Sequence, residues 1–403
     1  MVANNDCEVA VVGGGPVALT IALIIARAGI AVRVFEAQTS PEEDLRASTF
    51  HPPTLDMLAT LGLAAPLVAQ GLMCPNWQVR LHPSGERAVF DLSVLADETA
   101  HPYRLQCEQW KLLRLLATAL TAEPASSLEY GARVIGLLQD DAGAVVEIEY
   151  AGTGRREQVG ARLVVGADGA RSFIRKALDL PFEGLTYPET TILATTTFPF
   201  EAHLEGLSNV SYCWKDNGNF SLLKVPDRWR VSIYPREDAS VEDQLKPEAI
   251  DRAMQDIVPR PQPYDAMEIR PYRVHQRIVP RYRVGRVALA GDAAHINSPS
   301  GGMGLNGGIH DAFSLADAIV AMLRRGAPLD ALDAYDRRRR PVAAEQILAQ
   351  ADRNRARMRE RDPDKRREIL ADLQAIARDP LRLKAHLLRT SMIEGLRLAA
   401  TVA

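Results

Sequence analysis

The sequence contains few cysteines, no marked excess of either charge and no long apolar run free of charged residues. Its 403 residues include four cysteines and no Cys-x-x-Cys pair, which excludes a zinc knuckle or redox dithiol of that spacing. The formal net charge of -3 argues against a nucleic-acid binder, which usually carries a basic excess. The most apolar stretch, residues 17–34, is interrupted by Arg27 and Arg33 and lacks the features of a signal peptide. We therefore expect a cytoplasmic protein with reduced thiols and no stable membrane insertion, whose partner is a small molecule and not a nucleic acid.

Hydrophobic periodicity predicts an α/β architecture. Residues 8–35 form the pattern strand, glycine turn, helix and strand, which is a βαβ unit. Residues 190–234 predict an antiparallel meander with a turn at Asn217-Gly218, so a second sheet is expected. The last sixty or so residues are helical by pattern and densely charged, and we interpret their basic runs, residues 337–340 and 353–361, as solvated helix faces.

The first of three strand-to-glycine turns lies in the segment VVGGGPVALTIAL. Gly13 permits a tight turn, Gly15 lets the backbone approach a pyrophosphate, and Ala18 is small enough for the helix to pack on the strand. The helix N-terminus adds free N–H groups and a partial positive charge. Glu36 follows at the end of the second strand, where a carboxylate can accept hydrogen bonds from a ribose. This combination predicts dinucleotide binding in preference to a purely structural glycine turn.

Two further turns repeat the design. In GADGARSF, Asp168 follows a buried strand and could bind a nucleotide, or could form an Asp-Gly turn in which Ser172 caps the next helix. In GDAAHINSPSGGMGLNGG, Asp292 stands at the carboxyl end of a strand, where it suits a polyol hydroxyl. The loop at residues 299–304 lets main chain approach a flat ring, and the amides near residues 303–306 begin a helix.

The three motifs, in this order and at these separations, resemble the group A flavoprotein aromatic hydroxylases, the family of para-hydroxybenzoate hydroxylase. The resemblance spans residues 8 to about 345. It implies a discontinuous, Rossmann-like FAD-binding domain, an inserted antiparallel β-sheet for the substrate and a C-terminal helical segment. We accordingly assign residues 1–75, 105–180 and 278–345 to the FAD domain, residues 76–104 and 181–277 to the substrate domain, and residues 346–403 to the C-terminal helices.

The resemblance also implies which residues hold FAD. They come from the three motifs, from the end of the second strand and from three other positions: Gly13, Gly15, Pro16, Val17, Glu36, Ala37, Arg46, Gln109, Val134, Asp168, Asp292, Gly304, Leu305 and Asn306. Other roles stay open for three of them, since Arg46 could be a surface ion-pair partner, Gln109 a helix-surface residue and Val134 strand core.

In the family, NADH or NADPH reduces FAD, and O2 then forms a flavin hydroperoxide that hydroxylates an aromatic molecule. The resemblance therefore implies an aromatic monooxygenase acting on a phenolic or N-heteroaromatic substrate. Because the cofactor carries the chemistry, no catalytic side chain and no metal is assigned. The substrate-binding candidates are Tyr212, Trp214, Tyr234 and Pro299, and we interpret His295 as structural rather than as a proton shuttle.

Two other functions use the same motifs. An FAD-dependent dehydrogenase or reductase would bind the same cofactor without inserting oxygen, and a non-catalytic flavin-binding protein would need no substrate sheet. The sequence leaves open which ring is oxidised, whether a substituent is then lost or the ring opens, the choice of NADH or NADPH, and whether the protein is a monomer or homodimer.

Overall fold

The chain begins with the expected βαβ unit, which comprises β1 (Cys7–Val12), α1 (Pro16–Arg27) and β2 (Val32–Glu36). The structure is a computed structural model that describes residues 6–41, 43, 47–216, 218–234 and 240–402. Strand β1 is almost entirely buried, as expected for the centre of a parallel sheet. Helix α1 has Pro16 in its first turn, where the missing N–H is tolerated, and it packs against α4 (Gln109–Thr121) and α8 (Met303–Arg325).

The first sheet has the strand order β17-β18-β11-β1-β2-β8, with β9 and β10 added as an antiparallel hairpin beside β11. Strands β1, β2, β8, β11 and β18 run parallel. Because the carboxyl ends of parallel strands meet at one edge, the turns after β1, β11 and β18 come together there. The remaining bounds are β8 (Ser126–Tyr130), β9 (Ala132–Gln139), β10 (Ala144–Tyr150), β11 (Arg156–Gly166), β17 (Arg283–Val284) and β18 (Val287–Leu289).

The second sheet contains the predicted meander and has the order β19-β16-β12-β15-β14-β13-β5-β6. The meander strands pair antiparallel, whereas β5 joins β13 in parallel. Its members are β5 (Asn76–Leu81), β6 (Arg87–Asp91), β12 (Glu183–Thr196), β13 (Val210–Lys215), β14 (Gly218–Val225), β15 (Arg228–Ile233), β16 (Met267–Ile278) and β19 (His295–Ile296). A small third sheet of β3 (Thr49–Phe50), β7 (Arg104–Gln106) and β4 (Leu72–Cys74) completes the strands, and the α/β prediction is confirmed.

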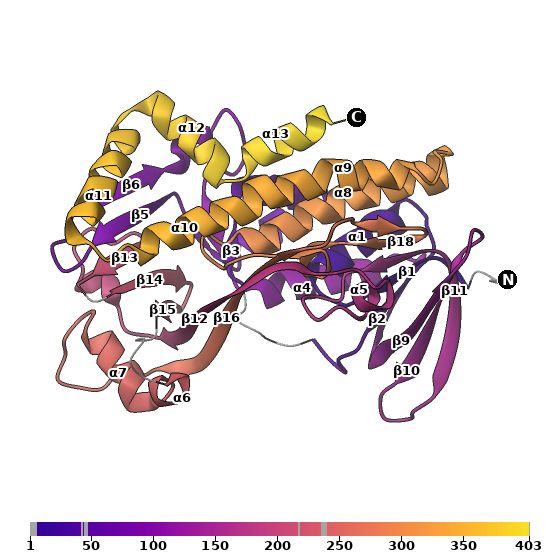
Figure 1. The fold of residues 1–403 in the computed structure, drawn as a ribbon, viewed down its shortest axis with the longest axis horizontal. Helices are drawn as coiled ribbons and strands as arrows, with labels where there is room; N and C mark the ends of the chain where they lie inside the picture. The colour runs from indigo at the N-terminus through magenta and orange to yellow at the C-terminus, as the bar shows by residue number, and fades with distance from the viewer. Residues whose placement is uncertain (1–5, 42, 44–46, 217, 235–239, 403) are drawn as a thin grey trace.

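The C-terminal helices extend over the substrate sheet (Figure 1). Helix α9 (Ala331–Val342), the π-helical segment Ala343–Leu348 and α10 (Ala349–Arg359) follow one another without a break, so the expected boundary at residue 345 falls inside a continuous helical run. After it come α11 (Pro363–Arg378), α12 (Pro380–Thr390) and α13 (Ile393–Thr401). The other helices are α2 (Pro52–Thr60), α3 (Ala64–Val68), α5 (Phe173–Ala177), α6 (Val241–Gln244) and α7 (Pro247–Gln255).

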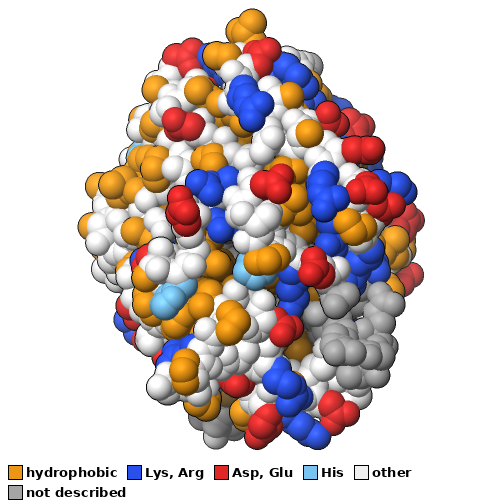
Figure 2. Space-filling view, turned by 90° about the vertical axis from the view of Figure 1, so that its left-hand side faces the viewer, with side chains coloured by type: hydrophobic (Ala, Val, Ile, Leu, Met, Phe, Trp, Pro, Cys, Tyr) orange, Lys and Arg blue, Asp and Glu red, His pale blue; other side chains and the backbone are white. Residues whose placement is uncertain are grey.

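The basic runs of this region are not uniformly solvated, which corrects the sequence interpretation. In the first run Arg339 is only 2% exposed, because its guanidinium donates to the carboxylate of Asp311 on α8. Elsewhere on the surface, basic and acidic side chains are interspersed, as Figure 2 shows for one face. Among the described residues, no helix is both long enough and apolar enough to cross a membrane.

Candidate functional site

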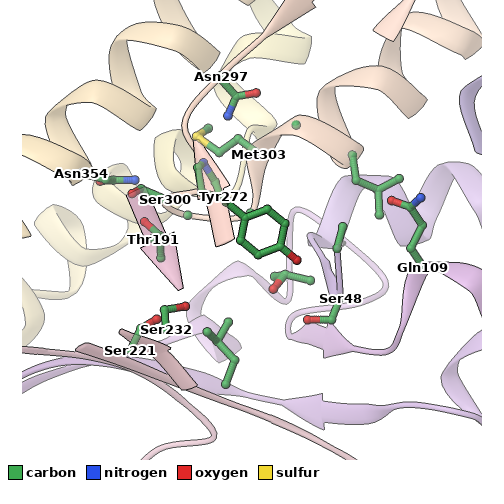
Figure 3. Close-up of a pocket in the computed structure, with 18 of the residues that line it drawn as sticks. Ser48, Gln109, Thr191, Ser221, Ser232, Tyr272, Asn297, Ser300, Met303 and Asn354 are labelled. Carbon is green, nitrogen blue, oxygen red and sulfur yellow. The ribbon is translucent and has the colours of Figure 1, made fainter. Parts of the chain in front are cut away.

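A cavity of about 420 Å³ lies between the carboxyl edge of the parallel sheet and the antiparallel sheet. The first and third glycine turns line one side of it, and the substrate sheet lines the other. Figure 3 shows Tyr272 of β16 between the loop that carries Asn297 and Met303 and the strands that carry Ser221 and Ser232. Residues 354, 357 and 358 of α10 complete the wall.

The first turn has the shape that its glycines predict. Gly13 has a φ of +107°, and a Cβ there would lie 2.5 Å from the carbonyl oxygen of Ala167. At Gly15, by contrast, an added Cβ would meet no atom within 4 Å. Gly15, Pro16 and Val17 all line the cavity, so open space lies in front of the N-terminus of α1. An anion there would face free backbone N–H groups.

Glu36 stands at the end of β2, beside this turn. Its carboxylate accepts hydrogen bonds from the N–H groups of Gly14 and Gln38, the second at 2.8 Å. Glu36 therefore joins the first turn to the segment after β2.

Ala37 and Val134 lie away from the main cavity. Ala37 lines a second cavity of about 240 Å³, together with Arg133 and Glu149. Val134 follows Arg133 in β9 but lines neither cavity, and its side chain is buried in the core. The Val134 side chain is therefore part of the strand core, which is the alternative that the sequence left open.

Ser172 is the N-cap of α5, as the sequence alternative predicted, and Asp168 binds the same helix start. The carboxylate accepts the Ser172 hydroxyl and the N–H groups of Phe173 and Ile174, the last two at 2.7 and 3.2 Å. Its neighbours Ala167 and Gly169 line the cavity, whereas Asp168 does not. The sequence expected this carboxylate at the cofactor, but the helix start uses its acceptor oxygens.

Arg175 links the second turn to the third. Its guanidinium donates to the carbonyl oxygens of Ala293, at 3.1 Å, and Ala170, at 2.9 Å, and lies 3.9 Å from the ring centroid of Phe182. The turns at the carboxyl edge are therefore connected directly by a side chain.

The third turn places Asp292 on the cavity wall. Gly291 has a φ of +59°, and a Cβ added to it would lie 3.0 Å from the Val17 side chain. A Cβ added to Gly308 would lie 2.6 Å from the same side chain. These glycines let the third turn and α8 approach α1 closely. Residues 299–305, which include Pro299, Gly304 and Leu305, line the cavity, and Gly302 begins α8 with a φ of +67°.

Asn306 holds the start of α8 against β3. Its amide donates to the carbonyl oxygens of Thr49, at 2.9 Å, and Gly302, at 2.6 Å, and accepts from the N–H of His51 at 2.8 Å. The side chain is fully buried and does not line the cavity. The Asn306 amide therefore fixes the glycine loop, and its contact with the cofactor stays a prediction.

Buried histidines surround the same loop. A ring nitrogen of His51 lies 2.9 Å from the carbonyl oxygen of Gly301, and burial, reinforced by the Arg104 charge, lowers the pKa of His51 to about 3. His295 is 1% exposed and lies 2.7 Å from the carboxylate of Asp311. This pairing agrees with the structural interpretation of His295.

Gln109 lines the cavity from the first turn of α4 (Figure 3). Its backbone N–H donates to the carbonyl oxygen of Ala47 at 2.9 Å, which ties α4 to the segment before β3. Arg46, expected to contact FAD, lies outside the described residues.

Tyr212, Tyr234 and Pro299 line the cavity, whereas Trp214 does not. Burial raises the pKa of Tyr234 to about 12. Trp214 is completely buried, and its indole N–H donates to the carbonyl oxygen of Arg357 at 3.2 Å. This corrects the expectation for Trp214, because the C-terminal helices cover that end of β13.

The sequence analysis missed several cavity residues. Thr191, Ser221 and Ser232 lie on the sheet at positions that period-two spacing from Tyr234 and its neighbours could have indicated. The others come from elements far apart in the chain: Trp77, Arg104, Arg230, Tyr272, Asn354 and Arg357.

Comparisons with known proteins agree with this arrangement. A family described as an FAD binding domain matches residues 6–351. The para-nitrophenol 4-monooxygenase of Pseudomonas sp. (strain WBC-3) is 36% identical over 394 residues, which is 96% of this chain and 96% of that protein. The 6-hydroxy-3-succinoylpyridine 3-monooxygenase of Pseudomonas putida is 34% identical over 348 residues, which is 86% of this chain and 88% of that protein.

Solved structures show the same likeness. The p-nitrophenol 4-monooxygenase of Pseudomonas putida has a TM-score of 0.89 and 31% identity, and the match covers 96% of this chain and 98% of that one. A ternary complex of aklavinone-11 hydroxylase with FAD and aklavinone has a TM-score of 0.78 and 26% identity. The match covers 88% of this chain and 70% of that one. The chain belongs to the family of FAD-dependent aromatic monooxygenases.

Proposed function

We propose that this monooxygenase hydroxylates a small phenol or hydroxylated N-heterocycle that contains a single ring. The observation that carries the proposal is the cavity of about 420 Å³ in which the glycine loop faces the polar side chains of the substrate sheet. This volume lies near the lower end of the range for small-molecule sites, and the flavin ring would share it, so the room for a substrate is small. The names of the relatives, which refer to para-nitrophenol and a hydroxylated pyridine, support the same class.

We assign the phosphates of FAD to the first turn. The open space at Gly15 and the free N–H groups of α1 fit a pyrophosphate. Glu36 is our candidate for the ribose, and Ala37 and the backbone at Val134 for the adenine side, because Ala37 lines a separate cavity next to Arg133.

We assign the flavin half to the larger cavity. Asp292 is our candidate for the polyol chain, and Gln109 lines the same cavity. The loop at residues 299–305 lacks bulky side chains at Gly301, Gly302 and Gly304, so it fits the face of a flat ring, and α8 directs its N-terminal dipole there.

When bound, FAD supplies the redox chemistry, with hydride from NADH or NADPH and with O2 as the oxygen source. The chain's own residues orient the substrate and exclude water. Because burial raises its pKa to about 12, Tyr234 stays protonated at neutral pH and offers its hydroxyl as a hydrogen-bond donor. Thr191, Ser221 and Ser232 add polar groups from the sheet.

The test is NADH and NADPH oxidation by the purified, FAD-loaded protein with 4-nitrophenol, catechol or 2-hydroxypyridine. We expect at least one of these to accelerate oxidation and to gain an oxygen atom by mass spectrometry, and cyclohexanol, which is not aromatic, to do neither. Stimulation only by multi-ring substrates would contradict the proposal.

A cytoplasmic location and a monomeric or homodimeric state remain our proposals from the sequence.

A further inference from the structure

Two guanidinium groups line one part of the cavity and have no carboxylate partner among the residues that the structure describes. Arg104 of β7 is 2% exposed, and Arg357 lies on α10. Burial lowers the pKa of each guanidinium, and Tyr212 partly offsets this by raising the pKa of both groups. No carboxylate of the described residues shifts the pKa of Arg104 or Arg357. Nε and Nη1 of Arg104 and Nε of Arg357 are buried and have no hydrogen-bond partner in the described part of the chain.

Neutral side chains, one of them aromatic, contact these two guanidinium groups. The guanidinium carbon of Arg104 lies 4.9 Å from the ring centroid of Trp77, which stacks on Phe90 at 4.2 Å. The indole nitrogen of Trp77 is also buried without a partner among the described residues. Arg357 donates to the side-chain oxygen of Asn354 at 3.0 Å. This part of the cavity is therefore rich in N–H donors that lack acceptors.

Charge balance indicates what is missing there. Arginine stays protonated in proteins, and a buried charge is unfavourable unless it is paired. Asp292 is the one carboxylate among the described residues that line the cavity, and it belongs to the third turn. A bound anion would offset this cost.

We propose that the substrate carries an ionised oxygen substituent, a phenolate or a carboxylate, and that Arg104 and Arg357 bind it. The proposal rests on the proposed function, since the same cavity holds the ring. Charge-assisted hydrogen bonds from two guanidinium groups would select ionised rings over neutral rings of equal size. The two residues would also determine which ring carbon faces the glycine loop.

The experiment measures ligand affinity by changes in the flavin absorbance of the FAD-loaded protein. Two matched pairs separate the sources of the charge. One is 4-nitrophenol, at a pH where it is ionised, against 4-nitroanisole, which has no acidic proton; the other is benzoate against benzamide. We expect the wild type to bind the ionised member of at least one pair roughly tenfold or more tightly. The pair that shows this preference identifies phenolate or carboxylate.

Variants locate the preference. Arg104→Gln and Arg357→Gln should each lower the affinity for the ionised ligand by roughly ten- to hundredfold. The affinity for the neutral ligand should fall by less than about threefold. Arg104→Lys should retain part of the preference. Arg367→Gln, which removes an exposed cation on α11, is the control and should change neither affinity. FAD content and the melting temperature report folding, and because the two arginines lie on separate elements, one variant suffices if the other fails to fold.

Either of two results would overturn the proposal. One is that the wild type binds the ionised member of neither pair more tightly than the neutral member. The same holds if none of the four ligands binds detectably. The other is equal weakening of ionised and neutral ligands by the variants. If the preference is present but no phenol is hydroxylated, the proposed function fails while the anion site stands.

Discussion

His295 and Asp311 form a buried pair, with the histidine Nε2 2.7 Å from a carboxylate oxygen of Asp311. The other oxygen of Asp311 accepts from Nε of Arg339 at 2.8 Å, and the backbone N–H of Gly291 donates to the carboxylate at 3.3 Å. One carboxylate on α8 thus joins the third turn, β19 and α9.

We predict that Asp311→Asn destabilises the protein by about 3–5 kcal/mol, because it leaves the buried Arg339 without its counter-charge. Urea unfolding of the apoprotein measures the change. Asp317→Asn is the control on the same helix, since Asp317 is exposed and pairs with an exposed arginine, and it should change stability little. Equal effects of the two variants would show that the buried pair is not important for stability.

The same pair predicts a pH dependence. Burial alone would raise the pKa of Asp311, but His295 and Arg339 lower it below its usual value. A lowered carboxyl pKa stabilises the fold above the unfolded-state pKa of about 4, and this contribution is lost as the pH falls through the folded-state pKa. The stability difference between wild type and Asp311→Asn should therefore narrow below about pH 4. A difference that stays constant with pH would contradict the assignment.

Gly13 and Gly15 should respond differently to the same substitution. Gly13→Ala should destabilise the apoprotein by at least about 1–3 kcal/mol, because the residue has a positive φ and its Cβ would collide with Ala167. Gly15→Ala should leave the stability of the apoprotein nearly unchanged. It should lower the affinity for FAD by roughly tenfold or more, because its Cβ would occupy the space assigned to the phosphates. Thermal unfolding and flavin-fluorescence titration measure the two effects. Full FAD affinity in Gly15→Ala would refute the phosphate assignment.

Asp292→Ala should yield protein that is folded but poor in flavin, because Asp292 lines the cavity at the position we assign to the polyol chain. Asp141→Ala is the matched control, since Asp141 lies in the exposed hairpin turn between β9 and β10. The ratio of flavin to protein absorbance after purification is the measurement. Equal flavin content in both variants would place the polyol chain elsewhere.

Tyr234→Phe tests the hydrogen-bond donor on the substrate sheet. Because burial raises the pKa of Tyr234 to about 12, its ionisation does not contribute to a rate profile between about pH 6 and 9. The variant should lower kcat/KM by roughly five- to tenfold, as expected for one lost hydrogen bond, without moving any inflection of the profile. A shifted inflection would mean that Tyr234 titrates during turnover.

Local sequence patterns predicted the parts of the site that are contiguous along the chain. The turn at Gly13 and Gly15 follows from one strand-turn-helix segment, so its form and its place at the sheet edge could be predicted. The family resemblance implied that Asp168 and Asn306 contact the cofactor, whereas in the structure their side chains bind a helix start and a loop. A matching motif does not show which groups of a residue are already used within the fold.

Long-range packing could not be predicted in this way. Period-two spacing placed Tyr212 and Trp214 on one strand face, but it gave no sign that the C-terminal helices cover Trp214 and leave Tyr212 at the cavity. Arg104 and Arg357 line the same cavity although they lie on β7 and α10. Their proximity depends on how distant elements pack, which hydrophobic periodicity does not encode.

The most direct test of the central claim is isotope incorporation during turnover with a phenol. The FAD-loaded protein is supplied with NADH or NADPH and with dioxygen labelled with the heavy isotope of oxygen, and the product is analysed by mass spectrometry. A monooxygenase places one labelled atom in the aromatic product and forms none of that product without dioxygen. Nicotinamide oxidation without any oxygenated product, or a product whose new oxygen atom is unlabelled and therefore comes from water, would contradict the account.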